Sequence, residues 1–514
     1  MLKRALLSAI LLCGALLAAT APPKLVVVVI IDQFRYDYLT RFKSEYHGGL
    51  DRLWKTGAVF TNAHLQHFPT VTAVGHATVL TGAIPSLSGI VGNEWFDRET
   101  GRRITSVFDS KVTLLGAAKG DGASPGRLLV SSIGDELKSS GTGAPRVIGI
   151  SLKDRAAILP AGRMADGAYW FDNASGNFVS STYYFPDLPA WVREFNGQHP
   201  ADRYAGAEWK SPAGKLFKTL PSAVGPQYYD AVERSPFGTE LVLALTMRAI
   251  QAEGLGSRNA TDLVSVSLSS TDLVGHAFGP DSAEIRDMNL QTDRLLGQFF
   301  EYLDARFRPG EVLVVFTADH GVAPLPKVLA ERRMPGGWIT EAALRKVADA
   351  ALRTKFGDGN WVLYAANGSF WLNRALIRQK MLKESNVEDG LAEALADVPH
   401  VSRAYSGWRL ETGQVLPDRV GLRVLNGYNP DRSADVITVL DPYWVYGAGE
   451  AGHGSPYSYD THVPLIFMGP GIKPGRYDRS VAINDIAPTL ATILEIETPS
   501  GSVGRVLDEM LEGR

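Results

Sequence analysis

The pattern of apolar and polar positions along the chain predicts strands that alternate with helices. Four short apolar runs, rich in β-branched residues, have the composition of strands that are buried on both faces. They cover residues 25–31, 146–150, 263–268 and 311–316. Helical periodicity lies between them, most clearly over residues 240–253 and 283–307. This alternation is typical of an α/β fold in which a mostly parallel central sheet is sandwiched by helices.

Shorter segments complete this prediction. Helices are expected at residues 37–42, 49–55, 75–80, 128–138 and 485–494, and further strands at residues 58–63 and 463–468. Residues 167–185 indicate a hairpin that turns at residues 173–176. Residues from about 186 to 235 are rich in Pro, Gly, Trp and Tyr but have little periodicity. We interpret them as a surface cover or lid rather than as core.

A change of pattern between residues 324 and 441 indicates an insertion. Segments of helical character at residues 341–352 and 388–396 alternate there with short strand-like segments. We therefore expect a small α+β subdomain at residues 324–441, inserted into a catalytic core that comprises residues 22–323 and 442–514.

The first 21 residues have the pattern of a secretory signal peptide. Lys3 and Arg4 precede an apolar stretch, and the small residues at 19–21 are typical of a cleavage site. A retained membrane anchor is the alternative, which the shortness of the apolar stretch disfavours. The single cysteine, Cys13, lies in this segment, so the exported chain would have neither disulfides nor thiolate metal ligands. These features predict a periplasmic or secreted bacterial protein.

Charge and composition argue against binding to nucleic acids. The 514 residues include 52 basic and 55 acidic ones, and loss of Lys3 and Arg4 would leave a net charge of about −5 (50 against 55). The sequence shows no basic stripe with interleaved aromatic residues. After the predicted signal peptide, no apolar run in the sequence is long enough to span a membrane.

A small polar run at residues 68–76 leads directly into one of the predicted helices. It places the hydroxyl of Thr72 near a helix N-terminus, where unpaired N–H groups and the helix dipole favour a phosphate or another oxyanion. In isolation, Thr70 or Thr72 would more simply be an N-cap. Residues elsewhere in the chain decide between these interpretations.

Residues of metal-ligand type follow three of the predicted strands. They are Asp32, Asp272 with His276, and Asp319 with His320, and His453 lies in a glycine-flanked loop. Each alone would be a turn, cap or packing residue, but parallel strands place their carboxyl ends at one edge of a sheet. Three Asp and three His without Cys suit Zn²⁺, although Mn²⁺ or Fe would also be tolerated. Six such groups and a threonine hydroxyl exceed one tetrahedral site and fit two ions that share a phosphoryl site.

In chain order, these residues resemble the motifs of the alkaline phosphatase superfamily. The matching motifs are Asp32, Thr72-x-x-Gly-His, Asn93, Lys153-x-Arg155, Asp272-x-x-x-His276, Asp319-His320-Gly and His453-Gly. The branch that the chain most resembles is that of the phosphate-irrepressible, PafA-type periplasmic monoesterases, near the nucleotide pyrophosphatase/phosphodiesterases. The resemblance extends from about residue 24 to the C-terminus and implies an alkaline phosphatase-like fold.

The resemblance also implies a mechanism. It assigns one Zn²⁺ to Asp272, His276 and His453, and a second to Asp32, Asp319, His320 and the Thr72 oxygen. The enzyme would hydrolyse phosphate monoesters and release inorganic phosphate. Thr72, activated by metal coordination, would attack phosphorus and form a phosphothreonine, which water then hydrolyses.

Lys153 and Arg155 distinguish a monoesterase from a diesterase. A dianionic monoester has three non-bridging oxygens that need positive charge or donors, whereas a diester carries a second organic group on one of them. In the PafA-type family a Lys-x-Arg pair accompanies monoesterases, and Asn93 would donate to another phosphoryl oxygen. The alternative for Lys153 and Arg155 is a solvated charged loop, although they directly follow a predicted buried strand.

Other functions share some of these residues. A phosphodiesterase or nucleotide pyrophosphatase of the same superfamily shares every metal ligand, and only Lys153 and Arg155 argue against it. A sulfatase needs a Cys or Ser in a C/S-x-P-x-R setting, which the sequence lacks. A non-catalytic phosphate- or metal-binding protein is disfavoured because each position that the mechanism needs has a competent residue. We interpret His64, His76 and His462 as packing or supporting residues.

Overall fold

The predicted apolar runs form one large central sheet. The computed structural model describes residues 22–141 and 143–512, so the predicted signal peptide lies outside the described residues. Within them the sheet has ten strands, in the order β20-β2-β19-β12-β1-β11-β6-β7-β8-β5. Their bounds are Gly475–Tyr477, Ala58–Phe60, Leu465–Met468, Val312–Thr317, Leu25–Ile31, Asp262–Leu268, Val147–Ser151, Gly167–Asp172, Asn177–Ser181 and Leu114–Leu115, respectively.

The centre of the sheet is parallel, as predicted. Strands β12, β1, β11, β6 and β7 all run in the same direction. Ile30 pairs with Thr317 and Ile31 with Leu268, so β12, β1 and β11 end at the same level. Two strands run in the opposite direction, β19 between β12 and β2, and β8 beside β7. Every residue of β1 and β11 is buried, because helices cover both faces of the sheet.

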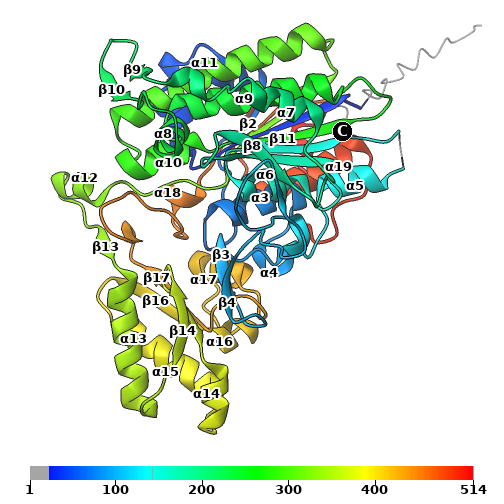
Figure 1. Ribbon diagram of the computed structural model, residues 1–514. Helices are drawn as coiled ribbons and strands as arrows, with labels where there is room; N and C mark the ends of the chain where they lie inside the picture. The colour runs from blue at the N-terminus through cyan, green and yellow to red at the C-terminus, as the bar shows by residue number, and fades with distance from the viewer. Residues whose placement is uncertain (1–21, 142, 513–514) are drawn as a thin grey trace, which may run out of the picture.

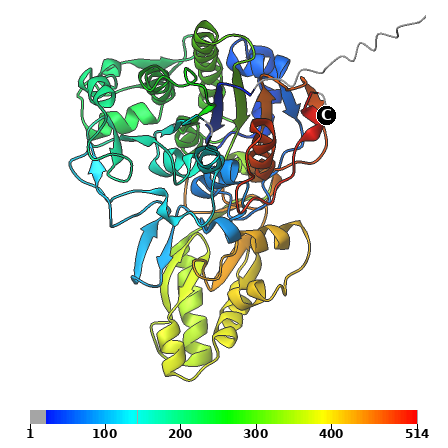
Figure 2. The same cartoon turned by 90° about the vertical axis from the view of Figure 1, so that its right-hand side faces the viewer.

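Two layers of helices flank the sheet (Figures 1 and 2). One layer comprises α2 (Gly49–Thr56), α8 (Pro226–Glu233), α9 (Pro236–Ala252), α10 (Ser270–Phe278) and α11 (Ala283–Arg306). The other comprises α3 (Thr72–Thr81), α5 (Ile133–Ser139), α6 (Asp154–Ala161) and α19 (Ile486–Leu494). The helix expected at residues 128–138 begins only at Ile133, because Ser132 is its N-cap and accepts a hydrogen bond from Asp135 N.

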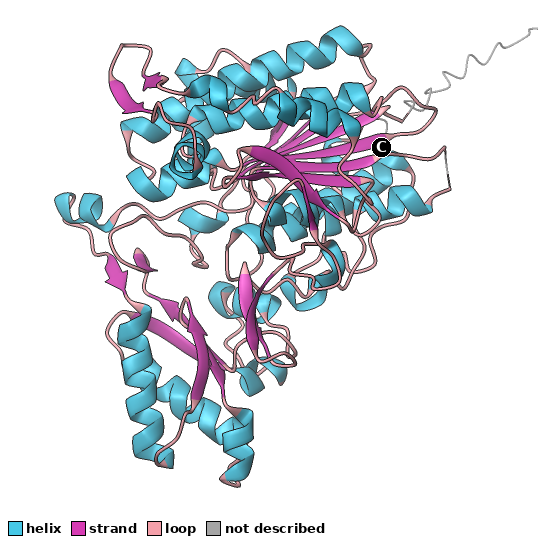
Figure 3. Ribbon diagram, viewed as in Figure 1, coloured by secondary structure: helices cyan, strands magenta, loops and turns pink. Residues whose placement is uncertain are grey.

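A smaller four-stranded antiparallel sheet projects from the main body, shown in yellow and orange at the bottom of Figure 1 and separated from the large sheet in Figure 3. Its strands, in spatial order, are β14 (Val362–Ala366), β15 (Ser369–Leu372), β17 (Val436–Leu440) and β16 (Val401–Ser406). Its helices are α13 (Glu341–Phe356), α14 (Arg374–Gln379), α15 (Glu384–Ala396), α16 (Gly407–Glu411) and α17 (Arg419–Gly427). This combination of elements is the α+β architecture that the sequence predicted for the region.

The two faces of the small sheet belong to different hydrophobic clusters. Phe370, Val436 and Leu440 pack with residues of α13 and α15. The alternate positions, Trp371 and Ile437, belong to a cluster that also contains residues of the main body. Because side chains alternate between the two faces of a strand, one face of the small sheet packs on its own helices, and the other face belongs to a cluster shared with the main body.

Short elements complete the structure. They are α1 (Tyr36–Arg41), α4 (Pro85–Ser88), β3 (Glu94–Asp97), β4 (Arg102–Thr105), α7 (Ala190–Gly197), β9 (Glu208–Lys210), β10 (Leu216–Thr219), α12 (Pro326–Glu331), β13 (Gly337–Ile339), β18 (Trp444–Tyr446) and α18 (Ser458–Thr461). Within the described ranges, no helix combines the length and the apolarity needed to cross a bilayer.

The interpretation of residues 186–235 as surface cover rather than core was wrong for the parts of this segment that form α7 and α8, whereas residues 212–216 and 221–224 are exposed. This segment contains α7, the β9–β10 hairpin and α8. Trp191, Val192, Tyr228 and Val232 are all at most 9% exposed and belong to the main hydrophobic core. The periodicity was weak because the elements are short and the buried residues are mostly aromatic, so few apolar positions repeat within any window.

Candidate functional site

The carboxyl ends of β1, β11 and β12 bring the predicted ligands together. Asp32 directly follows β1, Asp272 lies in the first turn of α10 after β11, and Asp319 follows β12. All three carboxylates are at most 3% exposed. This placement confirms the expectation that they share one edge of the parallel sheet, where open α/β sheets bind their ligands.

Two groups of side chains in this region have the composition and spacing of metal sites. Asp272, His276 and His453 form one group, and Asp32, Asp272 and His320 form the other. In each group the ligand atoms lie within 4.8 Å of one another. The first group is the predicted set for one ion, whereas the second places Asp272 beside Asp32 and His320. Asp319 lies next to the second group, with its Oδ2 atom 3.5 Å from His320 Nε2.

The three candidate histidine ligands are oriented in the same way. Each uses Nδ1 to donate a hydrogen bond to a backbone carbonyl: His276 to Ala451, His320 to Gly321 and His453 to Thr70, at 2.7, 2.9 and 2.9 Å. Since a carbonyl can only accept, Nδ1 carries a proton, and in the neutral imidazole Nε2 is the atom whose lone pair is available to a metal ion. The Nε2 atoms of His276 and His453 lie 3.2 and 3.7 Å from Asp272 Oδ1. Metal-ligating histidines typically have such an arrangement.

Burial and mutual repulsion shape the charges of the site. Burial, together with Asp272 and Asp319, raises the pKa of Asp32 to about 8. Burial and the neighbouring His320 and His276 hold the pKa of His453 well below its ordinary value. His453 is therefore a neutral imidazole, which is the form that binds metal ions.

Lys153 lies between two of the carboxylates. Its Nζ atom is 2.6 Å from Asp32 Oδ2 and 2.6 Å from Asp272 Oδ2. Its side chain is only 13% exposed, so the alternative of a solvated loop does not describe Lys153. Lys153 is the N-cap of α6 and Arg155 is the second residue of this helix, and the Nε atom of Arg155 is buried without a hydrogen-bond partner among the described residues. The structure thus brings Lys153 to the predicted ligands and leaves the Arg155 guanidinium with unused donor capacity.

Thr72 is the first residue of α3 rather than its cap. The N-cap is Val71, and no side chain in the described part of the chain caps this helix. Thr70 also has another role, because its hydroxyl donates to the carbonyl of Ser455 at 2.9 Å. The simpler interpretation of either threonine as an N-cap was therefore wrong, and Thr72 lies at the positive end of the helix dipole.

Asn93 lies beside Thr72. Its Oδ1 atom accepts a hydrogen bond of 2.8 Å from the N–H of Ala73, which follows Thr72 in α3. Because the carbonyl side of the amide is used in this way, the NH₂ group is the part of Asn93 left to donate to an oxyanion.

Two supporting residues were missed or undervalued at the sequence level. Gln33 follows Asp32, is 1% exposed, and adopts a left-handed backbone conformation with φ of 64°. Its side-chain amide donates to Asp272 Oδ1 at 2.6 Å, and its backbone N–H donates to Asp319 Oδ1 at 3.1 Å. A polar residue after a ligand is the only sequence signal for this role. His76, interpreted as a packing or supporting residue, is buried with Nδ1 2.9 Å from Thr72 O and 3.1 Å from Asp319 Oδ2.

The loop that carries His453 is supported by Asp460, which lies seven positions further along the chain. Asp460 Oδ2 accepts a hydrogen bond of 2.7 Å from Ser455 N. Its backbone carbonyl accepts another of 2.7 Å from Gly321 N, next to His320. Asp460 thereby ties the loop of one candidate ligand to the loop of another.

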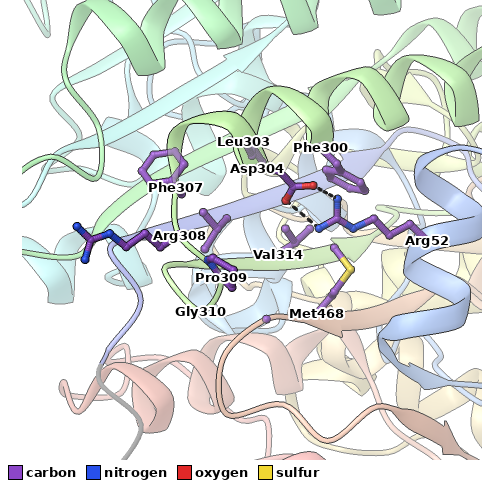
Figure 4. A pocket seen from close by; sticks show the side chains of 12 residues that line it. Arg52, Phe300, Leu303, Asp304, Phe307, Arg308, Pro309, Gly310, Val314 and Met468 are labelled. Carbon is purple, nitrogen blue, oxygen red and sulfur yellow. Dashed lines mark hydrogen bonds and ion pairs between the residues drawn. The ribbon is translucent and has the colours of Figure 1, made fainter.

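A separate pocket lies at the opposite end of the central strands. It has a volume of about 450 Å³ and is bordered by the end of α11 and the start of β12, with Arg52 and Asp304 paired at its edge (Figure 4). None of the candidate site residues lines it.

The comparisons with known proteins agree with this geometry. Residues 26–463 match the family model of type I phosphodiesterase / nucleotide pyrophosphatase. The chain is 36% identical to alkaline phosphatase PafA of Elizabethkingia meningoseptica, over 99% of each chain. It is also 36% identical to alkaline phosphatase PhoV of Synechococcus elongatus, over 96% of this chain and 94% of that one.

Solved structures give the same result. The crystal structure of wild-type PafA matches with a TM-score of 0.89 and 35% identity, covering 95% of this chain and 99% of that one. A PafA variant in which a threonine, an asparagine, a lysine and an arginine are substituted matches with a TM-score of 0.88 over the same shares. The chain therefore belongs to the type I phosphodiesterase/nucleotide pyrophosphatase family and, within the alkaline phosphatase superfamily, is of the PafA type.

Proposed function

We propose that this chain is a two-zinc alkaline phosphatase that hydrolyses phosphate monoesters through a phosphothreonine intermediate. The observation that carries the proposal is the convergence at one sheet edge of ligand-type side chains with Lys153, a cation whose side chain is only 13% exposed. Thr72 and Asn93 lie at the adjoining helix start. Relatives of matching length are alkaline phosphatases by name, which supports the same activity here.

The residues fit a pair of metal ions. Asp32 Oδ1, Asp319 Oδ2 and His320 Nε2 are buried without hydrogen-bond partners among the described residues, although buried polar atoms are usually paired. Oxygen and imidazole donors without sulfur suit Zn²⁺ in a hydrolytic enzyme. We propose Asp272, His276 and His453 as ligands of one ion, and Asp32, Asp319, His320 and Thr72 as ligands of the other. Bound there, the ions would lower the pKa of the Thr72 hydroxyl and balance negative charge on the phosphoryl group.

The protein groups then have distinct tasks. Thr72 attacks phosphorus in line, a P–O bond to threonine forms, and the bond to the leaving alcohol breaks. Lys153, Arg155 and the Asn93 amide donate to the non-bridging oxygens, where negative charge is concentrated. Water then attacks the phosphothreonine and releases inorganic phosphate and free Thr72.

The substituted PafA variant supports this choice of residues. It carries substitutions of a threonine and an asparagine 21 positions apart, and of a lysine and an arginine two positions apart. The same spacings separate Thr72 from Asn93 and Lys153 from Arg155 in this chain.

One comparison tests the proposed specificity. The zinc-loaded protein should hydrolyse p-nitrophenyl phosphate with a much higher kcat/KM than bis(p-nitrophenyl) phosphate, which has the same leaving group. A phosphate monoester presents three charged non-bridging oxygens to Lys153, Arg155 and Asn93, whereas a diester presents only two. Equal values, or a preference for the diester, would contradict the proposal.

A phosphodiesterase is the second candidate function. The family model that matches most of the chain is that of type I phosphodiesterases and nucleotide pyrophosphatases, and it favours this alternative. A preference for the diester in the experiment above would establish it, since both activities would use the same nucleophile and ligands.

Two further proposals concern the organisation of the chain. We propose that residues 324–441 form a subdomain inserted into a core of residues 22–323 and 442–514, because strands β14 to β17 pair only with one another within the described residues. We also propose that residues 1–21 direct export to the periplasm or the medium, which the basic start and the apolar stretch support.

A further inference from the structure

The small sheet shares a hydrophobic cluster with the segment that carries the proposed nucleophile. Trp371 and Ile437 on its inner face share a hydrophobic cluster with Ala73 of α3 and Trp95 of β3. Trp95 is 1% exposed and lies next but one to Asn93. One hydrophobic cluster therefore includes residues of the small sheet and of both segments that adjoin the proposed phosphate site, α3 and β3.

The hairpin β3–β4 fixes the backbone of Asn93. Glu94, the first residue of β3, pairs with Thr105 at the end of β4. Just beyond this pair, the carbonyl of Asn93 accepts a hydrogen bond of 2.9 Å from Ser106 N. Any displacement at the base of the hairpin is therefore transmitted to Asn93.

Tyr364 of β14 holds the base of this hairpin. Its hydroxyl donates to Glu94 Oε1 at 2.9 Å. Its ring stacks on that of Phe96, with the centroids 6.2 Å apart and the planes 22° apart. The other oxygen of Glu94 pairs with Arg103 of the neighbouring strand. Glu94 is thus held from both sides, once within the hairpin and once from the small sheet.

An ion pair holds the other end of the hairpin. Arg98, directly after β3, lies 2.8 Å from the carboxylate of Asp435. Asp435 is 1% exposed and is itself fixed by Arg374 at 2.8 Å and by the N–H of Leu372 at 2.6 Å. The small sheet therefore contacts the hairpin at both ends, through Tyr364 and through Asp435. Two such contacts indicate that the small sheet fixes the position of the hairpin.

We propose that Tyr364 is a positioning residue for phosphate recognition, acting through Glu94 on Asn93. By fixing Glu94, the Tyr364 hydroxyl sets the position of the Asn93 backbone relative to the N-terminus of α3. There, the N–H of Ala73 donates a hydrogen bond to the Asn93 side chain. The amide NH₂ is then aimed at the phosphoryl group before the substrate arrives. This inference rests on the proposed function, because it takes Asn93 to be a donor to the phosphoryl oxygens.

The test compares two tyrosines whose hydroxyls make contacts at the small sheet. Tyr364→Phe removes only the hydroxyl that reaches Glu94. Tyr446→Phe is the matched control, because the hydroxyl of Tyr446, in β18, donates to the carbonyl of Thr438 in β17 and makes no hydrogen bond to the hairpin among the described residues. We expect Tyr364→Phe to lower kcat/KM for p-nitrophenyl phosphate about 3- to 10-fold, and to raise the inhibition constant of inorganic phosphate by a similar factor. Tyr446→Phe should leave both quantities unchanged.

A double-mutant cycle distinguishes positioning from a general loss of stability. In an Asn93→Ala background, Tyr364→Phe should cost less than about twofold, because there is no amide left to position. Glu94→Gln, which keeps the oxygen that accepts from Tyr364, should retain more activity than Glu94→Ala. The same loss from Tyr364→Phe in both backgrounds would overturn the inference while leaving the proposed function intact. If Asn93→Ala itself had no effect on monoester hydrolysis, the proposed role of Asn93 would be wrong, and the inference would fall with it.

Discussion

The ammonium group of Lys153 lies 2.6 Å from the carboxylate of Asp32, although 121 positions separate the two residues in the chain. They are brought together because β6, which precedes Lys153, lies two strands away from β1 in the sheet. A buried lysine at this point places positive charge beside the space that a dianionic phosphoryl group would occupy.

Removal of this charge should change specificity rather than abolish chemistry. We expect Lys153→Ala combined with Arg155→Ala to lower kcat/KM for p-nitrophenyl phosphate on the order of 100-fold, since each charge-assisted hydrogen bond contributes roughly 1.5–3 kcal/mol. The loss for bis(p-nitrophenyl) phosphate should be much smaller. Arg193→Ala, which breaks an exposed ion pair with Asp187, is the control and should affect neither substrate. Equal losses on both substrates would contradict the assigned role.

Thr72 should be indispensable. Thr72→Ala should lower turnover by at least about 10³-fold, because the substitution removes the hydroxyl that is proposed to form the covalent intermediate. Thr72→Ser, which keeps a hydroxyl, should retain measurable activity. Acid quenching with ³²P-labelled substrate should trap labelled wild-type protein and no labelled Thr72→Ala protein. Label that persists in the alanine variant would point to a different nucleophile.

Metal removal should inactivate and destabilise the protein. Three buried carboxylates, Asp32, Asp272 and Asp319, lie close together, and mutual repulsion and burial raise the pKa of Asp32 to about 8. Bound cations would relieve this repulsion, so chelation should abolish turnover and lower Tm by at least about 5 °C. Added Zn²⁺ should restore both, and elemental analysis should find two zinc ions per chain. A metal-free protein with unchanged Tm and rate would rule out the two-metal site.

Gln33 should affect metal affinity without taking part in the chemistry. Gln33→Met keeps the length of the side chain but removes its hydrogen bond to Asp272. We expect the affinity for Zn²⁺ to fall about 10-fold in a titration against a competing chelator, because partners that orient a ligand contribute on this scale. Gln291→Met, at a half-buried position of α11 where the side chain accepts a hydrogen bond from Arg294, is a suitable control. Unchanged affinity would show that Asp272 is oriented by its other contacts.

Glu388 should make stability depend on pH in the small α+β unit. Burial raises the pKa of Glu388 to about 7, so the folded state favours its protonated form. Protonation of Glu388 makes its full contribution to the free energy of unfolding below pH 4.5, and this contribution is lost as the pH rises through about 7. Glu388→Gln should therefore stabilise the protein at pH 8 by on the order of 2 kcal/mol and have little effect at pH 4. Thermal unfolding at both pH values measures the difference. The same shift in Tm at pH 4 and pH 8 would contradict this account.

Much of the fold was predictable because its signals are local. The β-branched runs of β1, β6, β11 and β12 define buried strands by composition alone. Because these strands are parallel, the ligand-type residues that follow them lie at the same edge of the sheet. The hairpin of β7 and β8 was equally visible from its turn residues. In such cases a few neighbouring residues determine the outcome.

Other features depend on partners far away in the sequence. Gln33 is recognisable as a support only once α10 is placed, because its hydrogen bond reaches Asp272, 239 positions away. The core residues between 186 and 235 pack against α9 and α11, as the hydrogen bond from Trp209 to Asp287 shows, and no local pattern in the segment itself specifies that packing. Whether Thr72 caps α3 depended on the backbone conformation of Val71, which composition does not determine.

The position of β19 also has a consequence for how the chain folds. This strand, at Leu465–Met468, separates β2, at Ala58–Phe60, from the rest of the sheet. The early strand can therefore join the sheet only after more than 400 further residues have been synthesised and folded. Contacts over such sequence distances are slow to form. A nascent or truncated chain that ends before β19 would leave β2 unpaired, so completion of the sheet must be a late step in folding.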